Sequence, residues 1–138
     1  METIIVNVAW CDRNFGGSFS DNVPGAVVFT AHSFADLKQT ARETLAFHIE
    51  GLIADGEHIP DWLAKGDYTI AFHYMDIPTM LHACESIVTL AAISRASGIN
   101  PSQLSHYANG VKTPRPEQRR RIVDGLHKIA SDLQQFTC

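Results

Sequence analysis

The segment 89–110 most constrains the fold, because it ends one helix and begins the next within a few residues. Residues 89–97 have the length and apolar spacing of a short helix, with Leu90 and Ile93 on one side. Gly98 follows where a tight turn needs a left-handed backbone, which glycine adopts without strain. The small residues of the first helix, Ala92 and Ser94, are where we expect another helix to cross closely. The segment therefore predicts two short helices joined by a sharp turn.

The second helix begins at Asn100-Pro101-Ser102-Gln103, which supplies an N-cap residue, a proline at the first helical position and a glutamine at the third. Leu104 and Tyr107 form its apolar side, and Asn109-Gly110 ends it with a left-handed stop. The other side is polar, and we expect four side chains to project outward from it: Ser102, Gln103, Ser105 and His106. Short hydrogen-bonding side chains suit base edges in a DNA major groove, where glutamine can bind adenine in a bidentate manner.

Basic residues follow this polar side along the chain. Lys112, Arg115 and Arg119 are placed to hold a phosphate backbone, which positions a protein on DNA without selecting a sequence. With Asn109 they complete the candidate DNA-binding set. The alternative is a helical bundle that has no role on DNA.

The charge is divided unevenly along the chain. Residues 1–88 contain four Lys or Arg and twelve Asp or Glu, a net charge of −8. Residues 89–138 contain seven Lys or Arg and three Asp or Glu, a net charge of +4, so the whole chain has a net charge of −4. A basic segment suits a polyanion, because phosphate contacts release counterions. An acidic segment attracts a basic protein and repels nucleic acid, although acidic residues also serve simply to keep helices solvated. The asymmetry predicts two partners of opposite charge.

The first half of the chain alternates between strand and turn signals. We expect three strands in an antiparallel meander, then a helix, then a fourth strand: Thr3–Trp10, Phe15–Ser20, Ala26–Thr30, a helix from Ser33 to Gly56, and Tyr68–Tyr74. The helix carries one apolar stripe: Phe34, Leu37, Ala41, Leu45, Ile49 and Leu52. The predicted class is α+β, with a β-β-β-α-β domain over residues 1–75 and an all-α domain over residues 76–138, whose first helix is expected from Thr79 to Ile87.

The last helix, from about Pro116, has a broad apolar stripe. We expect it to present four residues to the core: Ile122, Leu126, Ile129 and Leu133. Val123 and Ala130 widen the stripe beyond what so small a domain needs. The excess predicts a homodimer seam, with a tetramer as the alternative.

Residues 77–133 resemble Cro/C1-type (XRE-like) helix-turn-helix domains. The resemblance rests on Ile93-Ser94, Gly98-Ile99, Leu104-Ser105, Gly110 and Pro114, while Ser97 stands where an apolar residue is commoner. It implies a DNA-binding domain that reads operator DNA.

Residues 3–74 resemble HicB antitoxins. The motifs that carry the resemblance are Phe19-Ser20-Asp21 with Pro24-Gly25, Ser33-Phe34-Ala35-Asp36-Leu37, Ile49-Glu50-Gly51-Leu52, Asp55-Gly56-Glu57 and Ile59-Pro60. The resemblance implies that this domain has a partial RNase H-like fold and that the protein is an antitoxin. Such an antitoxin neutralises a small basic HicA-like toxin, which is an mRNA-cleaving ribonuclease, and represses its own operon. The candidate toxin-binding residues are in the turn of that motif: Asp21, Asn22, Pro24 and Gly25.

Catalysis and cofactors are not expected. Two-metal hydrolysis needs clustered carboxylates, and the first predicted strand contains none. Cys11, Cys84 and Cys138 are too scattered for a disulfide framework or a cysteine-rich metal site, so we expect no metal and no cofactor. The chain shows no signal peptide pattern and no membrane-length apolar run, which predicts a cytoplasmic protein. The alternative function is a stand-alone transcriptional regulator whose N-terminal domain senses another protein or a ligand.

Overall fold

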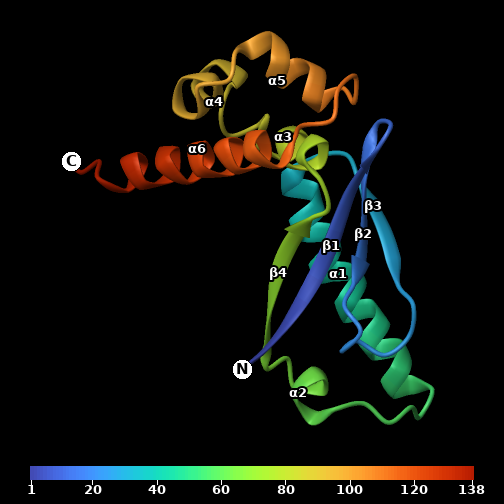
Figure 1. Ribbon diagram of the computed structural model, residues 1–138. Coiled ribbons are helices and arrows are strands. Elements are labelled where there is room, and N and C mark those ends of the chain that lie inside the picture. Colours follow the sequence, from blue (N-terminus) through green and yellow to red (C-terminus); the bar gives the residue numbers. More distant parts are fainter. The chain divides into compact units, whose positions relative to one another are not determined.

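The structure, a computed structural model, describes all residues 1–138, and the chain divides into two compact units, 1–79 and 80–138 (Figure 1). Its elements are β1 (Glu2–Cys11), β2 (Asn14–Phe19), β3 (Val28–Ala31), α1 (Phe34–Ala54), α2 (Asp61–Ala64), β4 (Tyr68–Tyr74), α3 (Ile77–Cys84), α4 (Leu90–Ser97), α5 (Pro101–Ala108) and α6 (Pro116–Gln134). The α+β class is confirmed. The first unit ends at Thr79 rather than at Met75, the last residue of the predicted domain.

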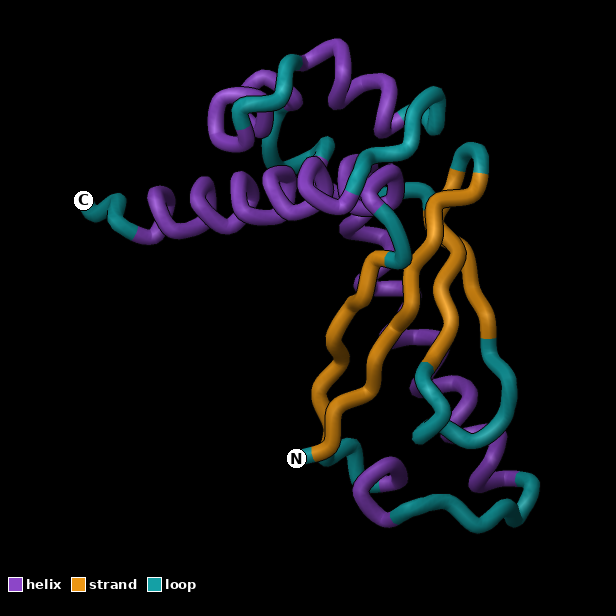
Figure 2. The backbone as a smooth tube through the Cα atoms, viewed as in Figure 1, coloured by secondary structure: helices purple, strands orange, loops and turns teal.

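The strands form one mixed sheet in the order β3-β2-β1-β4 (Figure 2). The first three strands pair antiparallel in chain order, as predicted. β4 returns through α1 and α2 to pair in parallel with β1 along its whole length, from Tyr68 opposite Glu2 to Tyr74 opposite Val8. A helical crossover of this length is what a parallel connection requires.

One face of the sheet is covered by α1. The β1 side chains on this face, Ile4, Val6 and Val8, are fully buried. Ile4 packs in a core with Leu45 and Ile49 of α1, and the other buried members of this core are Val23, Ile59 and Leu63. Four residues of the predicted α1 stripe are buried, because they recur at helical spacing toward the sheet: Leu37, Ala41, Leu45 and Ile49.

Several predicted boundaries were wrong. The short helix α2 was not expected, and β3 spans Val28–Ala31 rather than Ala26–Thr30. α3 begins at Ile77, two residues before the predicted Thr79, because the Asp76 carboxylate accepts hydrogen bonds from the Thr79 amide at 2.9 Å and from its hydroxyl at 2.5 Å. The Trp10 amide in turn donates to the Thr79 hydroxyl at 2.8 Å, which ties the start of α3 to the sheet unit.

The second unit packs α4, α5 and α6 around a small apolar core. Ile93, Leu104 and Ile122, one from each helix, are fully buried. α4 and α6 approach closely at Ser97 and Gly125, where a methyl group on Gly125 would come within 3.1 Å of the Ser97 amide nitrogen. Ser97 therefore takes part in a close helix crossing that the sequence did not predict.

The second half of α6 does not reach this core. Ile122 is fully buried, but Leu126 and Ile129 are half-buried. Leu133 is 52% exposed and Phe136, just past the helix, is 76% exposed. The expectation that Leu133 packs in the core was wrong, because α4 and α5 are too short to cover the whole of the 19-residue α6.

Candidate nucleic-acid interface

The turn between α4 and α5 is built from local capping bonds. The Thr89 hydroxyl accepts from the Ala92 amide at 3.0 Å where α4 begins. Gly98 ends α4 with a φ of 76°, the left-handed backbone expected from the sequence. The Asn100 side chain accepts from the Gln103 amide at 2.8 Å, with Pro101 in the first turn of α5. The predicted helix stop and helix start are both confirmed.

The polar side of α5 is only partly exposed. Ser102 and Asn109 are exposed, whereas Gln103, Ser105 and His106 are half-buried. The expectation that these four α5 side chains, Ser102, Gln103, Ser105 and His106, all project outward was therefore wrong in degree. Gln103 and Ser105 hydrogen-bond along the helix surface instead of extending away from it.

Two side-chain hydrogen bonds, each between residues one helical turn apart, hold Gln103 and Ser105. The Gln103 Nε2 group donates to the buried Tyr107 hydroxyl at 2.9 Å, and the Asn109 Nδ2 group donates to the Ser105 Oγ atom at 3.4 Å. A carboxamide has a second N–H and an oxygen, so Gln103 can still make a bidentate pair with a base. Tyr107 thus fixes the direction of the glutamine without using up its hydrogen-bonding capacity.

His106 shapes the loop that follows α5. Its carbonyl oxygen accepts from the Val111 amide at 2.9 Å and from the Lys112 amide at 3.4 Å. Gly110, with a φ of 74°, lets the chain reverse there. The Nδ1 atom of His106 is buried and has no hydrogen-bond partner, so this ring retains an unused polar atom beside the polar side of α5.

The cations near α5 fall into two groups. Lys112, Arg115 and Arg119 are exposed and form no ion pair or side-chain hydrogen bond, so their charges are available to a ligand. Arg120 instead pairs with Glu117 and Asp124, at 3.2 Å each.

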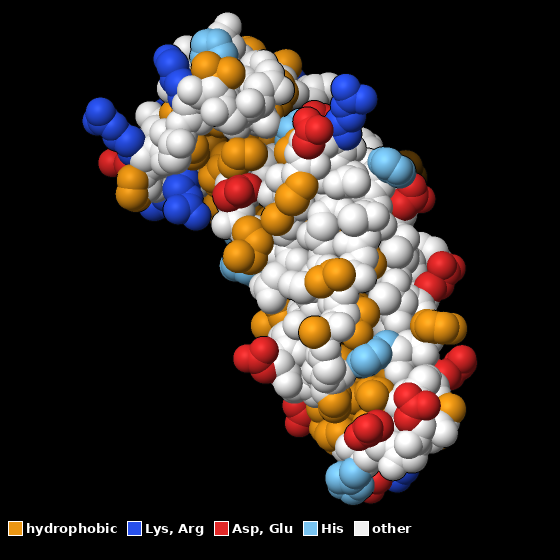
Figure 3. Space-filling model, turned by 90° about the vertical axis from the view of Figure 1, so that its right-hand side faces the viewer, with side chains coloured by type: hydrophobic (Ala, Val, Ile, Leu, Met, Phe, Trp, Pro, Cys, Tyr) orange, Lys and Arg blue, Asp and Glu red, His pale blue; other side chains and the backbone are white.

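Arg121 has a structural contact, because its Nε atom donates to the Ser97 carbonyl at 3.2 Å. Arg95, exposed and unpaired on α4, is a cation that sequence reasoning did not single out, since only the structure separates unpaired from paired arginines. Figure 3 shows Lys and Arg side chains gathered on the helical unit and Asp and Glu spread over the sheet unit.

The turn 21–25, the candidate toxin-binding segment, is anchored to its own unit. The Asn22 Nδ2 group donates to the Thr3 carbonyl at 3.0 Å, and the Pro24 carbonyl lies 2.6 Å from the His48 Nε2 atom. Val23 is buried in the core. Asp21 and Gly25 are exposed, so they are the residues of this turn that a partner can reach most readily.

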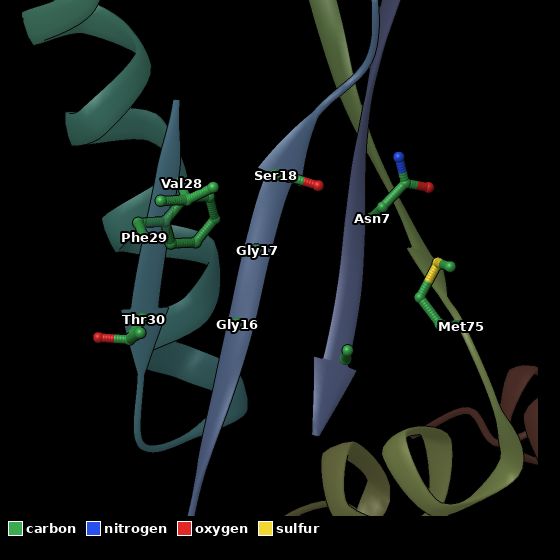
Figure 4. A pocket seen from close by; sticks show the side chains of 9 residues that line it. Asn7, Gly16, Gly17, Ser18, Val28, Phe29, Thr30 and Met75 are labelled. Atoms are coloured by element: carbon green, nitrogen blue, oxygen red, sulfur yellow. The ribbon is translucent and has the colours of Figure 1, made fainter. Parts of the chain in front are cut away.

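The face of the sheet opposite α1 carries a shallow cleft of about 570 Å³ (Figure 4). Short side chains line most of it, including Asn7 on β1 and Ser18 on β2, and the two glycines Gly16 and Gly17 precede Ser18 along β2. Val28 and Met75, at its margins, are 79% and 54% exposed.

None of the helices of this chain combines the length and apolar character needed to cross a bilayer. No three His, Cys, Asp or Glu side chains are grouped so that they could hold a metal ion. Comparison with family models, with curated proteins and with solved structures gives no match to this chain.

Proposed function

We propose that this protein is a HicB-like antitoxin that also represses transcription of its own operon. In this proposal α4 and α5 form a helix-turn-helix, and the four-stranded sheet with α1 is a partial RNase H-like domain. The observation that carries the proposal is the polar side of α5, fixed by the Gln103–Tyr107 contact and followed by the unpaired cations Lys112, Arg115 and Arg119. A helix end that offers polar side chains to base edges, with cations beside it for the phosphates, is how such motifs dock on duplex DNA.

The arrangement of α5 supports a division of roles on DNA. Gln103, Ser105 and Asn109 are held by contacts one turn apart, so they meet base edges with little loss of side-chain entropy. Ser102 and His106 lie on the same side of the helix. Lys112, Arg115 and Arg119 set the position along the backbone and contribute most of the salt-dependent affinity.

A homodimer through α6 would let two such units bind a palindromic operator. Apolar residues recur at alternating spacings of four and three along the helix and just beyond it: Ile122, Leu126, Ile129, Leu133 and Phe136. This is the repeat of a coiled-coil seam. The exposure of Leu133 and Phe136 leaves the outer part of that seam open to a second copy. The half-sites should then lie about one helical turn apart.

The partner of the sheet unit is proposed to be a small basic HicA-like toxin. Residues 1–79 contain eleven Asp or Glu and four Lys or Arg, so this unit attracts a basic protein. Asp21 and the backbone at Gly25 are the proposed contacts in the turn. We expect no nuclease activity of the chain itself, because β1 carries a single carboxylate, the exposed Glu2 at its start.

The test measures binding to duplex DNA from upstream of the gene, with Gln103→Ala as the variant. We expect affinity for the specific site to fall about tenfold or more, because a bidentate base contact contributes roughly 1–3 kcal/mol of discrimination. Affinity for unrelated DNA should be unchanged. Thr40→Ala, on α1, is the control and should bind as the wild type does. Unchanged site preference in Gln103→Ala would refute the assignment of α5.

A second measurement separates the antitoxin from the alternative, a stand-alone regulator. Co-expression with the neighbouring gene and pull-down should recover a small basic protein with the wild type and with Gln103→Ala. The stand-alone regulator would be favoured if the pull-down recovers no such protein and no small basic reading frame lies beside the gene.

A further inference from the structure

The strand β4 is an edge strand without the usual protection of such strands. It pairs with β1 only, so its outer edge carries no strand. Edge strands generally avoid pairing by being short, by carrying lysine or proline, or by a bulge. β4 has seven residues with no charged residue and no proline, and its register with β1 is continuous. The opposite edge, β3, has only four residues. β4 is therefore the edge that can accept another strand.

The outward backbone groups of β4 can be assigned from one hydrogen bond. The Met75 amide, directly after β4, donates to the Val8 carbonyl of β1 at 2.9 Å. Backbone groups of successive strand residues point alternately to the two sides. Ala71 lies four residues before Met75, an even number, so its N–H and C=O also point toward β1. Ile70 and Phe72 occupy the alternate positions and direct theirs away from the sheet.

The side chains of this edge are incompletely covered. Ile70 and Phe72 lie on the α1 face beside Ile4 and Val6 of β1. The β1 residues are fully buried, whereas Ile70 and Phe72 are only half-buried, because α1 packs mainly over β2 and β3. A groove of about 430 Å³ runs along this edge, and Arg42 of α1 is among the residues that line it. A strand added to β4 would cover the remaining apolar surface.

Residues of similar character flank Ala71 at equal distances along β4. On either side of it stand Ile70 and Phe72, then Thr69 and His73, then Tyr68 and Tyr74. A two-fold interface requires a surface that is complementary to itself. If two copies of β4 pair antiparallel about Ala71, Ile70 of one lies opposite Phe72 of the other, and aromatic with β-branched residues is a favourable cross-strand combination. No like charges face each other, because the strand has none.

We propose that β4 pairs antiparallel with β4 of a second copy of this chain, joining the two four-stranded sheets into one continuous sheet. Ile70 and Phe72 exchange the backbone hydrogen bonds, and the two Ala71 residues meet at the two-fold axis as a pair without hydrogen bonds between them. This interface is separate from the α6 seam and does not depend on the proposed function. The two interfaces together would give a tetramer.

The first test places a charge on the axis. Ala71 is exposed on the open face of the sheet, so Ala71→Lys should leave the fold intact, which circular dichroism checks. In the paired sheet the two lysines would lie opposite each other, and like charges there are destabilising. We expect the mass in solution to fall to half that of the wild type. Thr30→Lys, exposed on the opposite edge strand, is the matched control and should keep the wild-type mass.

Charge reversal makes this test sharper. Ala71→Glu alone should also halve the mass, and an equal mixture of the Lys and Glu variants should restore it. A mass for Ala71→Lys equal to that of Thr30→Lys would overturn the proposal. The α6 seam is tested separately by Leu133→Asp. If the α6 seam does not form and the β4 pairing does, the wild type is a dimer and Ala71→Lys is a monomer.

The second test reads the register directly, in a background with Cys11→Ser and Cys138→Ser. Directly opposed antiparallel residues without mutual hydrogen bonds have Cα atoms about 4.5 Å apart, within the range of roughly 4.4–6.8 Å that a disulfide spans. Mild oxidation of Ala71→Cys should therefore give a covalent dimer. Thr69→Cys, which would face His73 of the second copy, should not. Equal cross-linking of both variants, or none with Ala71→Cys, would contradict the proposed register.

Discussion

Gly98→Ala tests the turn that sets α5 against α4. Gly98 has a φ of 76°, and a methyl group there would lie 2.6 Å from the Arg121 Nη2 atom. Holding an L-residue in the left-handed region costs about 1–2 kcal/mol. Moving the guanidinium aside breaks the Arg121–Ser97 hydrogen bond, whose net contribution is about 1 kcal/mol. We expect the free energy of unfolding to fall by about 2–3 kcal/mol, the sum of these costs.

Gly110→Ala is the matched control in the same unit. Its φ is 74°, and nothing lies within 4 Å of a methyl group built on it, so only the backbone cost of about 1–2 kcal/mol applies. Arg121→Ala removes the obstruction at Gly98. In that background Gly98→Ala should cost no more than Gly110→Ala does.

Urea unfolding followed by far-ultraviolet circular dichroism gives the free energy of unfolding of the wild type, of the three single variants and of the Gly98→Ala, Arg121→Ala double variant. The expected result is a larger decrease for Gly98→Ala than for Gly110→Ala, with a difference that disappears when Arg121 is alanine. Equal decreases at the two glycines, or a difference that persists without Arg121, would refute the reasoning.

Two other predictions concern the sheet unit and the thiols. In Gly17→Ala the new methyl group would collide with the Phe29 ring, so the variant should be less stable by about 1–3 kcal/mol in urea unfolding. The neighbouring Gly16→Ala, whose nearest atom is 3.9 Å away, should be affected much less, and equal effects would contradict the packing. Burial raises the pKa of the Cys84 thiol, which lowers its thiolate fraction at neutral pH. Iodoacetamide should therefore modify Cys11 and Cys138, both exposed, faster than Cys84, whose rate should rise as the pH rises; three equal rates would be inconsistent with that burial.

The features that sequence alone predicted well are local. The start of α5 is set by Asn100 and Pro101, which act within one turn of helix, and the structure places both as expected. The same holds for the left-handed stop at Gly98 and for the cap of α1 at Ser33, whose hydroxyl accepts from the Asp36 amide at 3.1 Å. The α1 stripe was predictable because its period is that of the helix.

The features that sequence did not predict depend on residues far apart in the chain. The tie between α3 and the sheet depends on Thr79 meeting Trp10, and the approach of α6 to α4 depends on Gly125 lying against Ser97. Leu133 fits the helical period but lies beyond the reach of α4 and α5. For the candidate site, sequence identified the polar residues and the cations, but not that Tyr107 holds Gln103 or that Arg120 is already paired.

The salt dependence of DNA affinity tests most directly whether the cations beside α5 contact phosphates. The wild type, Arg115→Ala and Arg120→Ala are titrated with duplex DNA from upstream of the gene over a range of salt concentrations. Removing one phosphate contact makes the slope of log affinity against log salt shallower by about 0.9, so Arg115→Ala in a dimer should be shallower by about 2. Arg120→Ala, whose charge is paired with Glu117 and Asp124, should keep the wild-type slope. A slope for Arg115→Ala equal to that of the wild type would contradict the proposed interface.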